Sequence, residues 1–149
     1  MKTQNSILIA TVAALAFALA PVTQADGPPS TPPPFVGPVI TIHSAATTGT
    51  GDVLRGETGS FVLNRVRGFE YGIPVNFKVS GSAIAGVDYT ALVSPTYVGQ
   101  SGYAVLSVKT LPDLRGSFNR LAYSVVVTLE PGPAYIVGQP SSAEIWIAP

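Results

Sequence analysis

The chain has 149 residues, with eight basic side chains, eight acidic side chains, one histidine and no cysteine. Charged residues make up only 11% of the chain and form no block of like charge. Nucleic acid and anionic lipid both require clustered Lys and Arg, so neither is expected as a partner. The lack of cysteine excludes disulfides and a lipid-modified N-terminal cysteine.

Residues 1–25 resemble a cleavable signal peptide. Lys2 precedes an apolar run from Ile7 to Ala20, and small residues follow at Thr23-Gln24-Ala25. The run is shorter than the roughly 20 apolar residues that cross a bilayer. We therefore predict cleavage after Ala25, a secreted or periplasmic protein, and no stable membrane insertion after cleavage.

Residues 26–38 are rich in proline, which favours an extended spacer. The remaining residues, 39–149, suffice for a single domain. Their dominant period is two, which is typical of strands with one buried face. The clearest run is 73–80, where Ile73, Val75, Phe77 and Val79 share one face.

A second run covers 121–129, and Val126 on its otherwise polar face predicts a central strand. Weaker strands are expected at 39–45, 59–66, 96–98, 103–110 and 143–147, with turn-forming residues between them. Six or seven short strands with frequent turns predict an all-β fold, an antiparallel β-sandwich.

The sequence carries no catalytic signature. His43 alternates with Thr41 on the face opposite Ile40 and Ile42, as a solvated strand histidine does. A single histidine without a nucleophile elbow disfavours a serine hydrolase, and zinc sites draw on Cys and clustered His. The glycines at 49–56 match no phosphate-binding loop.

The most informative stretch runs from Val79 to Thr90, where a strand is followed by Gly-Ser-Ala-Ile-Ala-Gly-Val-Asp-Tyr-Thr. It resembles the signature of the Calx-beta domain family, with Ser82 in place of the family's threonine. The similarity extends to segments 56–65, 125–131 and 134–147. It implies an immunoglobulin-like sandwich, found in exchanger and integrin regulatory regions and in bacterial secreted or surface proteins.

Some Calx-beta domains bind calcium at one end of the sandwich, and the resemblance places Glu57, Asp88 and Asp113 at the matching positions. The family's acidic cluster is depleted here, because no acid follows Asp113 until Glu130. Calcium takes six to eight oxygen ligands. We therefore expect a weak or degenerate calcium site, or none.

These acids have other interpretations. Asp88 is expected to cap its own loop through backbone N–H groups, the alternative to metal ligation. Arg65, Arg67 and Arg115 are candidate ion-pair partners for Glu57, Glu70 or Asp113.

Together these observations favour a non-enzymatic binding or structural module with a protein or surface-polymer partner. Loops at the Asp88 end, including 67–72 with Phe69 and Tyr71, are the expected contact residues. One alternative is a small secreted hydrolase that pairs Glu57 with Asp88, or Glu70 with Asp113. Another is a surface or matrix subunit that assembles by strand exchange through an unpaired edge.

Overall fold

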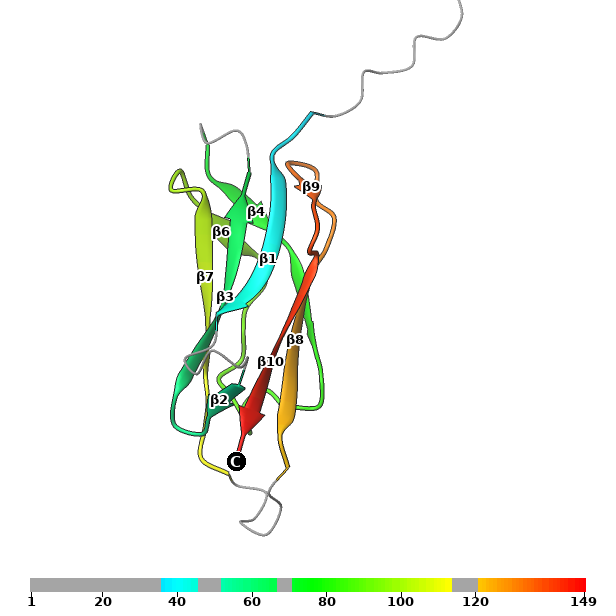
Figure 1. Ribbon diagram of the computed structural model, residues 1–149. Coiled ribbons are helices and arrows are strands. Elements are labelled where there is room, and N and C mark those ends of the chain that lie inside the picture. Colours follow the sequence, from blue (N-terminus) through cyan, green and yellow to red (C-terminus); the bar gives the residue numbers. More distant parts are fainter. Residues whose placement is uncertain (1–35, 46–51, 67–70, 114–120) are drawn as a thin grey trace, which may run out of the picture. The chain divides into compact units, whose positions relative to one another are not determined.

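The structure is a computed structural model that describes residues 36–45, 52–66, 71–113 and 121–149 (Figure 1). Every regular element among these residues is a β-strand. The ten strands are β1 Val39–Ala45, β2 Asp52–Leu54, β3 Thr58–Arg65, β4 Ile73–Val75, β5 Phe77–Ser80, β6 Thr96–Val98, β7 Tyr103–Lys109, β8 Tyr123–Leu129, β9 Ile136–Val137 and β10 Ser142–Ala148.

Two four-stranded sheets form the sandwich. The first has the order β7-β3-β1-β9 and the second β2-β10-β8-β5, while β4 and β6 form a separate two-stranded ribbon. The pairs β7–β3, β3–β1, β10–β8 and β8–β5 are antiparallel. The prediction of an all-β sandwich is confirmed.

The sheets are antiparallel, as predicted, apart from one pair of strands in each. Each four-stranded sheet contains one parallel pair, β1 with β9 and β10 with β2. Both pairs involve strands of two or three residues that sit at a sheet edge. Such short strands arise where a loop runs alongside an existing strand, so their direction follows the loop.

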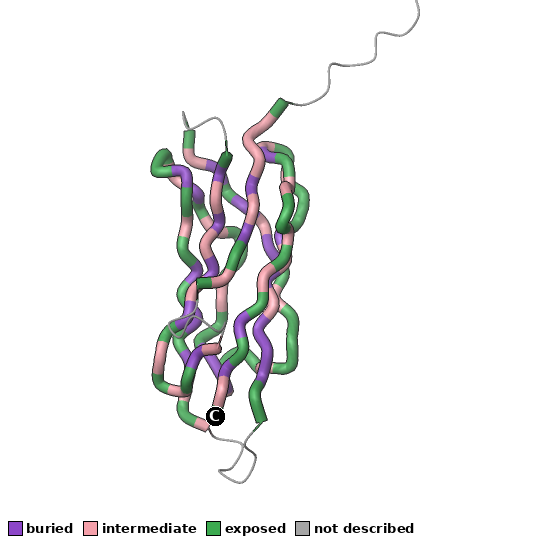
Figure 2. The backbone as a smooth tube through the Cα atoms, viewed as in Figure 1, coloured by how far each residue is buried: buried purple, intermediate pink, exposed green. Residues whose placement is uncertain are grey.

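The core lies between the two sheets and follows the alternation of the strands (Figure 2). Along β3, every second residue from Gly59 to Arg65 is buried. The fully buried side chains of largest volume come from both sheets and from the ribbon; they are Phe61, Ile40, Ile42, Leu63, Ile145, Ile147, Val53, Val75, Val98, Val108, Val125 and Val127.

The expected strand faces are confirmed. Ile73, Val75 and Phe77 are buried, and Val79 packs against the core. The run 73–80 is divided into β4 and β5 at Asn76, whose N–H donates to the Tyr135 hydroxyl at 3.0 Å. β8 lies between β10 and β5, as expected of a central strand. It begins at Tyr123 and leaves Leu121 exposed outside the strand.

The predicted signal peptide, 1–25, and residues 26–35 of the Pro-rich segment lie outside the described residues. Within the described part of the chain there is no helix long and apolar enough to cross a membrane.

Candidate cation site at the Asp88 end

Three segments meet at one end of the sandwich. The turn 54–57 connects β2 to β3, the loop 81–90 follows β5, and residues 110–113 follow β7. Thr110 joins the first and third segments, because its Oγ1 accepts from the Gly56 N–H at 2.8 Å and lies 2.7 Å from the Glu57 carbonyl oxygen. The Leu111 N–H donates to the Asp88 carbonyl oxygen at 2.8 Å and so joins the third segment to the loop.

The loop 81–90 is attached to the start of β8 by backbone and serine contacts. The Ala83 N–H donates to the Ser124 carbonyl oxygen at 2.9 Å, and the Ser124 N–H donates to Ser82 Oγ at 2.8 Å. Gly81 has φ +116, and a Cβ there would lie 2.2 Å from the Ser124 carbonyl oxygen. The glycine is therefore required by both backbone conformation and close approach.

Asp88 caps its own loop, which confirms one of the two sequence interpretations. Its Oδ2 accepts from the Ile84 N–H at 2.7 Å, and its own N–H donates to the Ile84 carbonyl oxygen at 2.8 Å. The residue is fully buried. A buried carboxylate is tolerated only with compensating partners. The partner of the other oxygen, Oδ1, therefore shows how the negative charge of Asp88 is balanced.

That second oxygen faces an arginine. Arg55 Nη2 donates to Asp88 Oδ1 at 3.0 Å, and Arg55 Nη1 donates to the Leu111 carbonyl oxygen at 3.0 Å. The guanidinium carbon also lies 5.8 Å from the centroid of the Tyr123 ring, within the range of a cation–π interaction. Only 11% of the Arg55 side chain is exposed. A positive charge is therefore built into this end of the sandwich.

Asp113 lies near the Arg55 guanidinium, whereas Glu57 is not paired with it. Asp113 Oδ1 lies 4.0 Å from Arg55 Nη2. Glu57 lies in the same turn as Arg55, and its buried Oε2 has no hydrogen-bond partner among the described residues. The described acidic and histidine side chains contain no group of three or more placed to share a metal ion. Two of the three predicted ligands thus converge on a guanidinium.

Tyr89 adds a titratable group to the site. Burial, and to a smaller extent the negative charge of Asp88, raise the pKa of the Tyr89 hydroxyl above its usual value of 10.0. The ring belongs to the core, with 3% of the residue exposed. Tyr89 is therefore held in the neutral form well into the alkaline range.

Arg55 was not among the arginines expected to pair with these acids, which were Arg65, Arg67 and Arg115. Of these three, only Arg65 is described. Its Nη1 donates to the Tyr71 carbonyl oxygen at the far end of β3. Glu70, the remaining expected partner, also lies outside the described residues. The signal that could have identified Arg55 is its place beside Gly56 and Glu57, in the turn that precedes a long strand.

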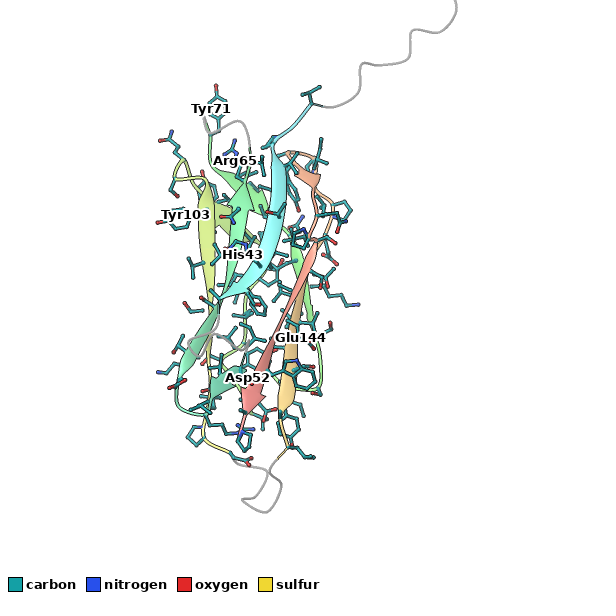
Figure 3. The ribbon with its side chains drawn as sticks, in the orientation of Figure 1. His43, Asp52, Arg65, Tyr71, Tyr103 and Glu144 are labelled. Atoms are coloured by element: carbon teal, nitrogen blue, oxygen red, sulfur yellow. The ribbon has the colours of Figure 1, made fainter. Side chains whose placement is uncertain are left out.

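The expectation that Tyr71 lies at the Asp88 end is wrong (Figure 3). Tyr71 lies at the end of the sandwich opposite Asp52, the first residue of β2, and Arg55 directly follows that strand (Figure 3). The eight residues of β3 separate the Glu57 turn from Arg65, which is about 26 Å of extended chain. Tyr71 therefore cannot share a surface with Asp88. Phe69 lies outside the described residues.

The remaining polar features do not form a catalytic arrangement. His43 is exposed and Nδ1 lies 3.2 Å from Asn64 Nδ2 across the β1–β3 pair, as expected for a solvated strand histidine. The described residues enclose no pocket.

Comparison with solved structures identifies the architecture. The crystal structure of CBD12 from CALX1.2 aligns with 72% of this chain at a TM-score of 0.56 and 12% identity. The fold is Calx-beta-like. The Calx-beta-like chain covers 44% of that structure. A second similar structure, the apo form of the Calx CBD1 domain, aligns with 73% of this chain and 96% of its own length, with a TM-score of 0.49 and 13% identity.

Neither a scan against family models nor a search of curated proteins finds a match for this sequence. At these identities, the likeness concerns the fold.

Proposed function

We propose that this chain is a non-enzymatic binding or structural module with a Calx-beta-like fold, in which Arg55 takes the place of a calcium ion at the Asp88 end. The observation that carries the proposal is the 3.0 Å contact between Arg55 Nη2 and the buried Asp88 carboxylate. The guanidinium neutralises Asp88 and links two loops, which is the task a bound cation would perform.

The residues at this end do not fit calcium while Arg55 is in place. Calcium requires six to eight oxygen ligands at 2.3–2.6 Å. Both Asp88 carboxylate oxygens already accept hydrogen bonds, one from Arg55 and one from Ile84. The guanidinium also lies 4.0 Å from Asp113, so a divalent cation near either acid would meet a like charge.

Glu57 is the acid that Arg55 does not satisfy. Its Oε2 is buried without a hydrogen-bond partner among the described residues. A single carboxylate supplies at most two of the oxygens that calcium needs, so this atom does not make a site by itself.

The hydrolase alternative is disfavoured by burial. A carboxylate that acts on a glycosidic bond must face a substrate groove. Asp88 is fully buried and hydrogen-bonded through both oxygens. The pair of Glu57 with Asp88 therefore cannot present two carboxylates to a polymer. Glu70 of the second pair lies outside the described residues.

We further propose that the module is secreted or periplasmic and acts through a protein or surface-polymer partner. The support for export is the sequence of residues 1–25, and the support for a binding role is the Calx-beta-like fold.

The decisive experiment is a thermal melt of the purified protein in millimolar calcium and in chelator. We expect identical melting temperatures for the wild-type chain. Arg55→Met is run alongside, because it removes the guanidinium that contacts Asp88 and Asp113. Glu144→Ala, which removes an exposed acid on β10, is the matched control. A calcium-dependent rise in the wild-type melting temperature that disappears in Asp88→Ala would contradict the proposal.

A further inference from the structure

The four edges of the two main sheets differ in length. β9, β2 and β5 have two, three and four residues, whereas β7 has seven. Short edge strands are one of the ways by which proteins avoid pairing between molecules. Three edges follow this rule, and β7 is the exception.

One side of β7 is paired with β3 along its whole length, from Tyr103 to Lys109. On the other side, β6 contacts β7 without pairing with it, and the backbone hydrogen bond seen among the described residues is at the C-terminal end, where the Thr90 N–H donates to the Lys109 carbonyl oxygen at 2.9 Å. No described strand pairs with that side of residues 103–108. Alternate backbone N–H and C=O groups of an edge strand point away from its partner strand. Residues 103–108 therefore present hydrogen-bonding groups that no described strand uses.

The side chains of β7 do not protect this edge. Tyr103 and Val105 are 54% and 50% exposed, and Lys109, the strand's single charged residue, lies at its end. An edge is normally protected by a charge, a proline or a bulge in its middle. Val105 instead continues an outward-facing row through Val62 of β3 and His43 of β1.

We propose that two copies of this chain associate by antiparallel pairing of their β7 strands, with Val105 opposite Val105 of the second copy. This register pairs Tyr103 with Ser107 of the other copy and uses only the unpaired segment. It joins the two first sheets into one continuous sheet of eight strands. The proposal names the partner of the module and does not depend on Arg55.

A second copy is favoured over an unrelated extended peptide because the strand is complementary to itself. In this register, the row His43–Val62–Val105 meets its own symmetry mate, so the two exposed valines cover each other. The two Lys109 residues lie at opposite ends of the pairing, about 26 Å apart along the strands, and do not repel each other. Isologous pairing of this kind closes as a dimer.

Because the chain has no cysteine, disulfide trapping gives a direct test. Directly opposed residues of an antiparallel pair have Cα atoms about 4.5–5.5 Å apart, which suits a disulfide. Val105→Cys should form a covalent dimer under mild oxidation, and the wild-type protein should double in mass with increasing concentration in sedimentation experiments. Val105→Lys should remain monomeric, because it places two lysines opposite each other.

Ile84→Cys is the matched control, since Ile84 is 52% exposed and lies in the loop 81–90, outside the β7 strand. It should be trapped more slowly than Val105→Cys at equal concentration. Equal melting temperatures of the variants would show that each is folded. A wild-type chain that stays monomeric at all concentrations, or equal trapping of the two cysteine variants, would overturn the proposal. The calcium melts test the Arg55 site separately, so either idea can fail alone.

Discussion

Arg55 and Asp88 are 33 positions apart in the sequence, and their side chains meet at 3.0 Å in a site where the aspartate side chain is 1% exposed. The pair joins the turn between β2 and β3 to the loop after β5. Buried ion pairs are costly to form, but removing a single partner leaves an uncompensated charge. This relationship makes the pair the most sensitive point of the site.

Arg55→Met should lower the free energy of unfolding by about 3–5 kcal/mol, because it leaves the Asp88 carboxylate buried without its cation. The double variant Arg55→Met with Asp88→Asn should recover part of this loss, since the neutral amide can still accept from the Ile84 N–H. Urea unfolding followed by tryptophan fluorescence measures both. A single-variant loss below about 1 kcal/mol would show that the pair behaves as an exposed one.

The raised pKa of Tyr89 predicts a loss of stability in alkali. In the folded chain, this pKa lies above the unfolded value of 10.0, so the folded state holds its proton more tightly. The resulting stabilisation is complete below about pH 10 and decreases as pH rises through the folded-state pKa. Tyr89→Phe should weaken the decrease in urea midpoint between about pH 8 and pH 11. An unchanged pH profile would rule out this role.

Gly81→Ala should be markedly more destabilising than Gly86→Ala. Both glycines have positive φ, at +116 and +81, but a Cβ at Gly81 would lie 2.2 Å from the Ser124 carbonyl oxygen, whereas one at Gly86 would meet no atom within 4 Å. The Gly86 variant should lose about 1–2 kcal/mol from backbone strain. The additional loss in the Gly81 variant measures the attachment of the loop to β8. Equal losses would show that the loop can shift away from β8 with no further loss of stability.

Phe77→Ala should cost about 3–5 kcal/mol, since the residue is 4% exposed in the core at the start of β5. Its exposed neighbour Lys78 provides the control, and Lys78→Ala should change stability little. Chemical denaturation measures both variants. An unchanged midpoint for Phe77→Ala would contradict the register of β5 against β8.

Export can be tested by mass spectrometry. If residues 1–25 are a signal peptide, the chain recovered outside the cytoplasm of a bacterial host should begin at Asp26. Recovery of an intact N-terminus from that fraction would argue against cleavage.

The period of two located the larger strands because each has one face in the core. β1 and β6 match their predicted ranges, 39–45 and 96–98, and the ends of β3, β7 and β10 differ by one residue. β2 and β9, which have three and two residues, were not predicted. They exist through parallel pairing with distant strands, which local sequence does not encode.

Two acids of the candidate site, Asp88 and Asp113, were predicted from the sequence, whereas its cation, Arg55, was not. The Asp-Tyr-Thr sequence drew attention to Asp88, and its loop-capping role follows from general turn chemistry. Arg55 carries no motif, and only the tertiary fold brings it to Asp88. The location of Tyr71 was wrong for a related reason, because a sequence does not show at which end of a sandwich a loop emerges.

The position of β10 has a consequence for the timing of folding. This strand is paired on both sides, with β8 and with β2, and it contributes the fully buried Ile145 and Ile147. It is also the last strand of the domain, so neither the second sheet nor the core can close until residues 142–148 have been synthesised. A nascent chain is thus unable to reach its final packing on the ribosome before the end of the domain emerges.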